Sequence, residues 1–143
     1  MSKGNTFEND VMKLIFNATA IANIADNAAS SPLTDLYVSL HTADPGESGD
    51  QTASEATYTS YSRVAVARSG SGWTVTGNAA ENAALVQFPQ CTGGTNTLTH
   101  VGIGTASSST GKLLYKGALA ASLSVSSGIQ PQFAAGALVV TED

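Results

Sequence analysis

Apolar and polar residues alternate in the segment 36–41, which reads Leu-Tyr-Val-Ser-Leu-His. This period of two is typical of a β-strand that buries one face and leaves the other in water. The segment that follows, Asp44-Pro45-Gly46, ends the strand, because proline lacks an N–H donor and glycine accepts the backbone angles of a tight turn. The pattern therefore predicts a half-buried strand that runs into a polar turn.

Short apolar runs and polar turns continue in the same way to the C-terminus. They predict strands at 36–41, 61–67, 73–77, 83–88, 97–103, 112–119, 121–126, 129–133 and 136–141. Turns rich in glycine and serine separate most of these runs. Many short strands at this spacing indicate an all-β domain, and we predict a jelly-roll-like β-sandwich over residues 35–143.

An amphipathic helix is predicted ahead of these strands, between residues 5 and 16. The apolar positions that share one face of this helix are Phe7, Val11, Leu14 and Ile15. This face either closes one end of the β core or binds a partner subunit. We favour the core, because tertiary packing explains most amphipathic helices. The helix belongs to a predicted N-terminal helical segment of residues 1–34.

Charged residues make up only 12% of the chain, which is about half of the usual share. Serine, threonine, glycine and alanine take their place, and they predict a neutral, hydroxyl-rich surface suited to packing against other subunits. The formal net charge is −5, and the 6 lysines and arginines are scattered, so we predict no nucleic-acid partner. No apolar run is long enough to span a bilayer, so we predict no membrane partner.

The residues that most often carry chemistry are sparse. The single cysteine, Cys91, cannot form an internal disulfide, so folding needs no oxidising compartment. The two histidines, His41 and His100, lie on separate predicted strands, and we interpret them as strand residues rather than metal ligands. The sequence lacks the motif of a serine hydrolase and the context of a dinucleotide-binding loop. We therefore predict no catalytic residue, no cofactor, no metal and no small-molecule substrate.

Acidic residues cluster in the longest predicted loop, residues 42–60. Asp44, Glu47 and Asp50 suggest a calcium loop, but their spacing does not follow the EF-hand pattern, so solvated turn acids are the simpler interpretation. The composition predicts a mobile, exposed excursion, and long loops in compact domains are usually functional or disordered. We therefore predict that Asp44, Pro45, Glu47 and Asp50 contact a neighbouring molecule, together with the apolar face of the helix.

Several segments of the chain follow one another in a characteristic order and spacing. They are Leu36–Gly46, Tyr61–Val66, Phe88-Pro89, Thr99–Gly104, Gly111–Leu119 and Phe133–Leu138, the last built around a Phe-x-x-Gly-x-Leu pattern. In these segments the chain resembles a family of small tailed-bacteriophage virion proteins, whose members are described as tail fibre or head decoration (cement) proteins. The resemblance implies an all-β, jelly-roll-like structural subunit without enzymatic activity.

The leading function that this resemblance implies is a capsid cement protein, which binds the major capsid protein and stabilises the assembled head. Such a protein is expected to act as a homo-oligomer on the capsid surface, after assembly in the bacterial cytoplasm. One alternative is a tail component, such as a fibre-associated or baseplate subunit. Another is a carbohydrate-binding β-sandwich, and a hydrolase is the residual possibility.

Overall fold

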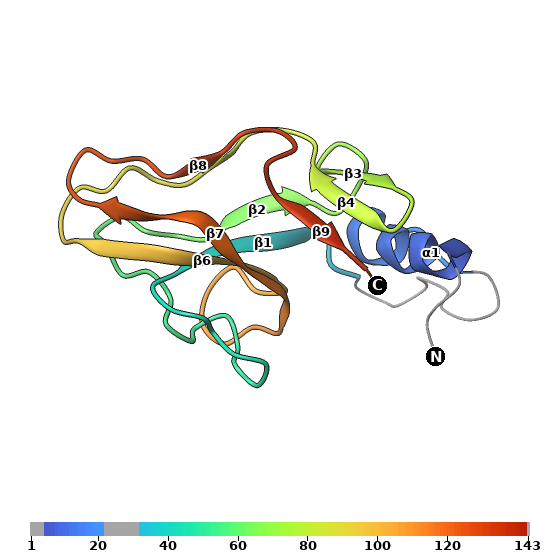
Figure 1. Cartoon of the computed structure of the whole chain (residues 1–143), viewed down its shortest axis with the longest axis horizontal. Helices are drawn as coiled ribbons and strands as arrows, with labels where there is room; N and C mark the ends of the chain where they lie inside the picture. The colour runs from blue at the N-terminus through green and yellow to red at the C-terminus, as the bar shows by residue number, and fades with distance from the viewer. Residues whose placement is uncertain (1–4, 22–31, 143) are drawn as a thin grey trace. The chain divides into compact units, whose positions relative to one another are not determined.

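The structure is a computed structural model, and it describes residues 5–21 and 32–142 (Figure 1). Its elements in chain order are α1 (Asn5–Asn17), β1 (Asp35–His41), β2 (Val64–Ala67), β3 (Trp73–Thr76), β4 (Ala79–Asn82), β5 (Val86–Gln87), β6 (Asn96–Gly104), β7 (Leu113–Val125), β8 (Gln132–Phe133) and β9 (Val139–Thr141). The predicted helix between residues 5 and 16 is confirmed as α1. The remainder of the predicted N-terminal helical segment lies largely at 22–31, outside the described residues.

The strands form three sheets. A four-stranded sheet has the order β2-β1-β6-β7, a three-stranded sheet has the order β3-β4-β9, and β5 pairs with β8. The pairings of β1 with β6, β6 with β7, β3 with β4 and β4 with β9 are all antiparallel. The prediction of an all-β fold with a short N-terminal helix is confirmed at this level. Within the described residues no sheet closes into a barrel, and these strand orders do not show a jelly roll.

The chain divides into two compact units, each made of segments far apart in the sequence. The first unit combines the chain up to Asp35 with Val66–Val86 and the chain from Phe133 onwards. The second unit combines Leu36–Ala65 with Gln87–Gln132. The predicted boundary between residues 34 and 35 stays a prediction.

Some of the predicted strands are confirmed, and others are shorter than predicted. The strands predicted at 36–41, 73–77 and 97–103 are confirmed as β1, β3 and β6. The strand predicted at 83–88 is present only as the two-residue strand β5, and β4, which ends at Asn82, was not predicted. The strands predicted at 61–67, 129–133 and 136–141 are present in shorter form as β2, β8 and β9.

One long strand, β7, replaces the two strands that were predicted at 112–119 and 121–126. It continues from Leu113 to Val125, because no proline or polar turn interrupts the alanine-rich sequence between them. The pairing with β6 changes register instead: Ala118 lies opposite His100, whereas Leu123 lies opposite Leu98. The residues between 118 and 123 therefore form an irregular, bulge-like stretch at the point where a break between two strands was predicted.

In the first unit, α1 packs on β3 and β4. Met12 and Phe16, one helical turn apart, are fully buried, and the Phe16 ring centre lies 4.8 Å from that of the fully buried Trp73. Burial of such large side chains supplies most of the stabilising free energy of a small unit. The buried stripe of α1 is therefore centred on Met12 and Phe16 rather than on the predicted apolar face.

An arginine from a distant part of the first unit stabilises the end of α1. The last turn of α1 contains no basic residue, and its final carbonyl groups have no partner within the helix. The guanidinium group of Arg68 donates to the carbonyl oxygens of Leu14 and Ile15, the latter at 2.6 Å. A cation at this position also complements the negative end of the helix dipole.

Candidate functional site

The loop that follows β1 covers one face of the four-stranded sheet in the second unit. Ser39 and His41, the polar positions of the alternating segment, are both fully buried, so β1 is buried on both faces. The prediction of a half-buried strand is wrong in this respect. The loop holds its place by backbone hydrogen bonds, from Thr42 N to Ser54 O and from Ala56 N to Leu40 O, each 2.8 Å long.

The predicted exposed excursion at 42–60 is also corrected in part, because the loop has buried anchors. Gln51 is 0% exposed, and Ala56 and Tyr58 are 4% and 2% exposed. The Gln51 amide oxygen accepts from Ala106 N at 2.9 Å. Burial raises the pKa of Tyr58 to about 12, so this residue stays a neutral phenol. The exposed residues lie both within 43–50 and at later positions of the loop, namely Thr52, Ser54, Thr57, Thr59 and Ser60.

His41 connects β1 to the covering loop. Its Nδ1 lies 2.8 Å from Ala53 O, and its Nε2 lies 2.8 Å from Ser39 Oγ. Because a carbonyl oxygen only accepts, Nδ1 carries the proton, and Ser39 Oγ then donates to the unprotonated Nε2. Both polar side chains are thus satisfied in a site closed to water.

Two glycines of β6 make this close packing feasible. A Cβ atom on Gly102 would lie 2.8 Å from both His41 Nε2 and Ser39 Oγ, and one on Gly104 would overlap the Gln51 side chain. The Gly-x-Gly segment of β6 therefore leaves space for buried polar groups on the covered face.

We expect acid to destabilise the chain through His41. Burial lowers the pKa of His41 below its ordinary value of 6.5, and it outweighs the hydrogen bond to Ala53 O, which raises it. Above pH 6.5 the imidazole is neutral in both folded and unfolded chains. As the pH falls below 6.5, the unfolded chain takes up the proton first, so the free energy of unfolding decreases.

Urea unfolding at neutral pH and at a series of lower pH values measures this decrease. The His41→Gln variant, which has no titrating group there, is expected to be less stable overall but to lose less of its stability on acidification. An unchanged acid slope in this variant would show that His41 does not cause the decrease.

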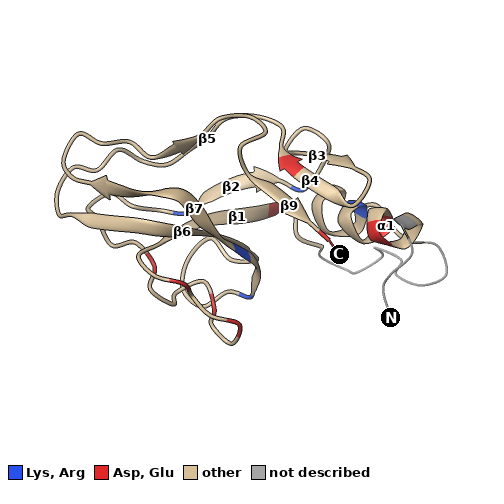
Figure 2. Ribbon diagram, in the orientation of Figure 1, with Lys and Arg blue, Asp and Glu red and all other residues tan. Residues whose placement is uncertain are grey.

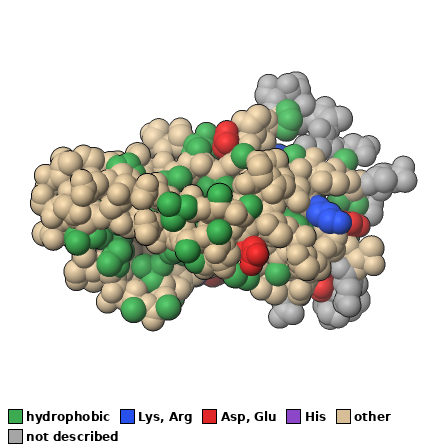
Figure 3. Space-filling view, turned by 90° about the horizontal axis from the view of Figure 1, so that it is seen from above, with side chains coloured by type: hydrophobic (Ala, Val, Ile, Leu, Met, Phe, Trp, Pro, Cys, Tyr) green, Lys and Arg blue, Asp and Glu red, His purple; other side chains and the backbone are tan. Residues whose placement is uncertain are grey.

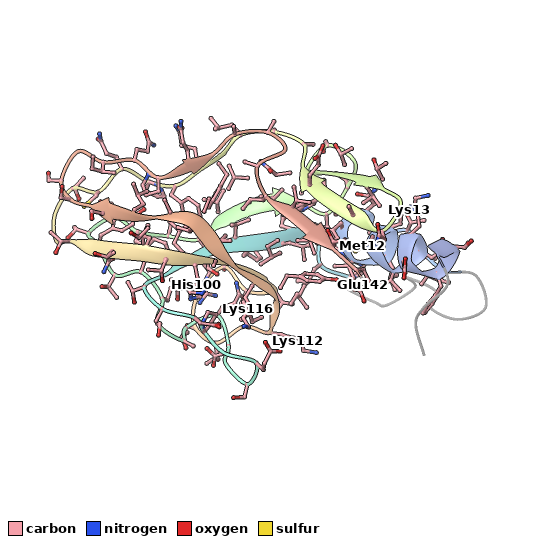
Figure 4. The ribbon with its side chains drawn as sticks, viewed as in Figure 1. Met12, Lys13, His100, Lys112, Lys116 and Glu142 are labelled. Atoms are coloured by element: carbon pink, nitrogen blue, oxygen red, sulfur yellow. The ribbon has the colours of Figure 1, made fainter. Side chains whose placement is uncertain are left out.

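The predicted acidic residues Asp44 and Glu47 are brought together by Lys116 of β7. Lys116 Nζ lies 3.0 Å from Asp44 Oδ1 and 3.1 Å from Glu47 Oε1, and its side chain points from β7 toward this loop (Figure 4). The hydrogen bond from Gly46 N and the contact with Lys116 lower the pKa of Asp44 below its ordinary value. The Glu47 side chain is 94% exposed, so it is available to another molecule.

A shallow pocket of about 330 Å³ lies beside this ion pair. It is lined by the loop residues Gly46, Glu47 and Gly49 and by residues 113–116 of β7. The lining is mainly polar, and within the described residues no three histidines, cysteines or acids come close enough to hold a metal ion. The site is suited to contact with a polar surface rather than to chemistry.

The other predicted contact residues differ in how accessible they are. Pro45 is buried, and Asp50 accepts from the backbone N–H and the hydroxyl of Thr52 at 2.7 and 2.6 Å. Those hydrogen bonds lower the pKa of Asp50 and identify it mainly as a turn-forming residue.

The predicted helix face lies in the first unit. Phe7 is 40% exposed, whereas Val11, Leu14 and Ile15 are partly buried. A role of this face in binding a partner stays a prediction.

Sequence analysis missed a buried ion pair that joins three segments of the second unit. Arg63 Nε donates to Glu55 Oε1 at 2.7 Å and Nη2 to Glu55 Oε2 at 2.8 Å, which is a bidentate pair. The guanidinium group also donates to the carbonyl oxygens of Ala106 and Ser109, each at 2.8 Å. The Glu55 hydrogen bonds raise the pKa of Arg63, so it remains charged. Only the short spacing of Glu55 and Arg63 in the sequence hinted at this pair.

Asn82 was also missed, although it joins β4 to the C-terminal segment of the first unit. It is 1% exposed; its Nδ2 donates to the carbonyl oxygens of Ala84 and Ala134, and its Oδ1 accepts from Leu138 N. The backbone of Gly136, which has a φ of +75°, donates to Asn82 O. The Phe-x-x-Gly-x-Leu pattern thus marks the segment that Asn82 binds.

The contact between the serine and the histidine of this site is not accessible to a substrate. Ser39 and His41 have the contact of a nucleophile and a base, but both are sealed from solvent and the third partner is a backbone carbonyl. Several acidic residues occur along the loop after β1, whereas the second half of β7 contains no charged residue (Figure 2). No helix in the described part of the chain combines the length and the hydropathy needed to cross a bilayer.

Comparison with known proteins identifies the family. A family model described as podophage GP4 fiber I protein gp80 matches residues 3–141, which is nearly the whole chain. A search of curated proteins finds no match. The family match supports the tail-component alternative better than the head cement function, and it confirms a structural virion protein that is not an enzyme. The chain therefore belongs to the podophage GP4 fiber I protein gp80 family, which is a family of phage tail fibre components.

Proposed function

We propose that this chain is a non-enzymatic subunit of a podophage tail, which acts by binding neighbouring virion proteins. The observation that carries the proposal is the family match over residues 3–141. The structure is consistent with it, because Ser39 and His41 on the covered sheet face are hydrogen-bonded and fully buried. Repeated weak contacts suffice for such a role, because neighbours in a particle are held at high effective concentration.

We further propose that the loop at 43–50 is one of the contact surfaces. Lys116 fixes Asp44 and Glu47 on a defined part of the second unit, so little conformational entropy is lost when a partner binds. Two acids share one lysine there, and the surface is expected to prefer a basic patch on the neighbouring protein. The partner in this proposal is another tail protein. If the chain lies on the head instead, the partner is the major capsid protein.

The location is tested with purified virions that are separated into heads and tails. Quantitative mass spectrometry of each fraction is expected to find the chain with the tails, in a small number of copies per particle. Recovery with head shells at a copy number close to that of the major capsid protein would overturn the tail assignment. Absence of the chain from both fractions would overturn the structural role.

The contact loop is tested in the same virions by replacing Glu47 with lysine. This exposed residue makes no buried contact, so the variant is expected to fold normally but to be depleted from the particles. Glu81→Lys, which changes another exposed acid on β4, is the matched control and is expected to be incorporated like the parent chain. Equal incorporation of both variants would contradict a role of the loop.

A further inference from the structure

Four of the five glutamines of the chain lie on β5 and β8 or on the residues that continue these two paired strands. They are Gln87, Gln90, Gln130 and Gln132, and all four are exposed. We call these four residues the amide ribbon. The fifth glutamine, Gln51, is fully buried in the covering loop. Figure 3 is seen from above, the side on which β8 lies in Figure 1, and its left part shows no charged side chain.

Two amide groups of the ribbon are fixed by hydrogen bonds to the backbone. The backbone N–H of Phe88 donates to Pro131 O at 3.0 Å, but a proline has no N–H to donate in return. Gln130 Nε2 donates to Phe88 O instead, at 3.0 Å, and Gln90 Nε2 donates to Gly128 O at 2.8 Å. Because an amide oxygen does not donate, these bonds determine which way each amide group is turned.

The fixed amide groups still have hydrogen-bonding capacity for a ligand. Gln90 and Gln130 each keep one N–H and the Oε1 oxygen, which have no further partner among the described residues. Gln87 Nε2 donates to Gln132 Oε1 at 3.1 Å, so the other two amide groups lie side by side. A donor and an acceptor at a fixed spacing match two neighbouring hydroxyl groups, each of which donates and accepts. Since the amide groups are already ordered, binding costs little conformational entropy.

The absence of charge indicates that this ligand is neutral. No aspartate, glutamate, lysine or arginine occurs between Asn82 and Gly111 or between Gly117 and Thr141, and these stretches contain both strands of the ribbon. An ionic ligand would lose water there without gaining an opposite charge. An added peptide strand is also disfavoured, because the carbonyl oxygens of Phe88 and Gly128 already accept from glutamines. A neutral compound with many hydroxyl groups fits best.

We propose that the amide ribbon binds a neutral saccharide chain. Gln87 and Gln90 lie three residues apart, which is about 10 Å along an extended strand, so the ribbon spans more than one sugar ring. Binding by one chain is expected to be weak, and several copies on one particle would strengthen it by effective concentration. The site belongs to the second unit alone, so the proposal holds or fails independently of whether the chain lies on the tail.

Nuclear magnetic resonance of the purified full chain, with ¹⁵N in its glutamine side chains, tests the proposal. Cellohexaose, maltohexaose and mannohexaose are the neutral probes. At least one of them is expected to shift the side-chain signals of the four ribbon glutamines and to leave that of the buried Gln51 unchanged. Glucose is expected to bind more weakly than the hexasaccharide, because one ring reaches fewer amide groups. Hexagalacturonate, which carries a carboxylate on every ring, is also expected to bind more weakly.

A double variant locates the binding on the ribbon. Gln87→Ala with Gln132→Ala removes two exposed amide groups but keeps the glutamines that bind the backbone. It is expected to weaken binding of the hexasaccharide by about tenfold or more, because about two hydrogen bonds are lost. The matched control is Thr97→Ala with Ser124→Ala, another exposed pair on neighbouring strands of the second unit, and it is expected to bind like the parent chain. Circular dichroism checks that both variants are folded.

Four results would overturn the proposal. The first is that none of the three hexasaccharides shifts the ribbon signals. The second is equal binding by the two double variants, and the third is that glucose or hexagalacturonate binds as tightly as the neutral hexasaccharide. The fourth is tighter binding of a capped hexapeptide of alternating serine and valine, which would identify the ribbon as a site for a peptide strand.

Discussion

Replacing Arg63 with methionine is expected to lower the free energy of unfolding by about 3–5 kcal/mol, because it leaves the buried Glu55 carboxylate without its cation and with the Tyr61 hydroxyl as its remaining side-chain donor. The side chains of Arg63 and Glu55 are only 2% and 18% exposed, so water cannot replace the lost hydrogen bonds. The carbonyl oxygens of Ala106 and Ser109 lose their donor as well. Since a small domain has a total stability of about 5–15 kcal/mol, the variant is expected to be close to unfolding.

Urea unfolding followed by circular dichroism measures this loss. The fluorescence of Trp73, the single tryptophan, reports on the first unit, whereas Arg63 belongs to the second. Agreement of the two signals would show that both units unfold together. If the tryptophan signal keeps the midpoint of the parent chain while circular dichroism shifts, the two units unfold separately.

Lys116→Met is the matched control, because it breaks an ion pair whose acids are exposed. Exposed pairs contribute little, so this variant is expected to lose far less stability than Arg63→Met. The double variant Arg63→Met with Glu55→Leu is expected to recover much of the loss, because no buried charge is then left unpaired. Equal losses for Arg63→Met and Lys116→Met would contradict a stabilising role of the buried pair.

The alternation of residues 36–41 predicted the strand β1 correctly, but it wrongly predicted that one face of this strand is exposed to water. A period of two says that Ser39 and His41 share a face, and it does not say that a later loop covers that face. The covering depends on Gln51 and Ala53, which lie ten and twelve residues after His41, and on two glycines of β6. Such burial follows from tertiary packing, which a single sequence pattern does not encode.

The dependence on tertiary packing also explains why the polar contacts of Arg63 and Asn82 were missed and why the buried face of α1 differs from the predicted one. Arg63 binds Ala106 and Asn82 binds Ala134, pairs that lie 43 and 52 residues apart in the sequence. On α1, periodicity predicted a helix of the right length, but the fully buried residues are Met12 and Phe16, and Phe16 packs against Trp73. The sequence therefore shows which residue types are able to form ion pairs and hydrogen bonds, but it does not show which residues they bind in the fold.

Asn82→Asp is expected to lower the free energy of unfolding by about 3–5 kcal/mol at neutral pH, although the two side chains have nearly the same shape. Asn82 Nδ2 donates to two carbonyl oxygens, at 2.7 and 2.8 Å. A carboxylate only accepts, so a buried negative charge would face those two oxygens without a donor. The first unit would then lose the link between β4 and the segment around Gly136.

The loss is expected to depend on pH, because the pKa of the introduced carboxyl is raised in the folded chain. Below its unfolded pKa, about 3.9, the group is neutral in both states and the charge penalty is absent. As the pH rises above this value, the unfolded chain ionises first, and the penalty grows until the folded pKa is passed. Unfolding of Asn82→Asp and of the parent chain across this range of pH measures the difference.

Asn96→Asp is the matched control, because the same change of side chain is not expected to destabilise the fold at this position. The Oδ1 atom of Asn96 accepts from the backbone N–H groups of Thr57 and Tyr58, each at 2.8 Å, so a carboxylate keeps both hydrogen bonds and strengthens them by its charge. This variant is therefore expected to be as stable as the parent chain at neutral pH, or more so. If the two variants lose the same stability, the direction of the hydrogen bonds at Asn82 does not determine the outcome, and the assignment of its amide is wrong.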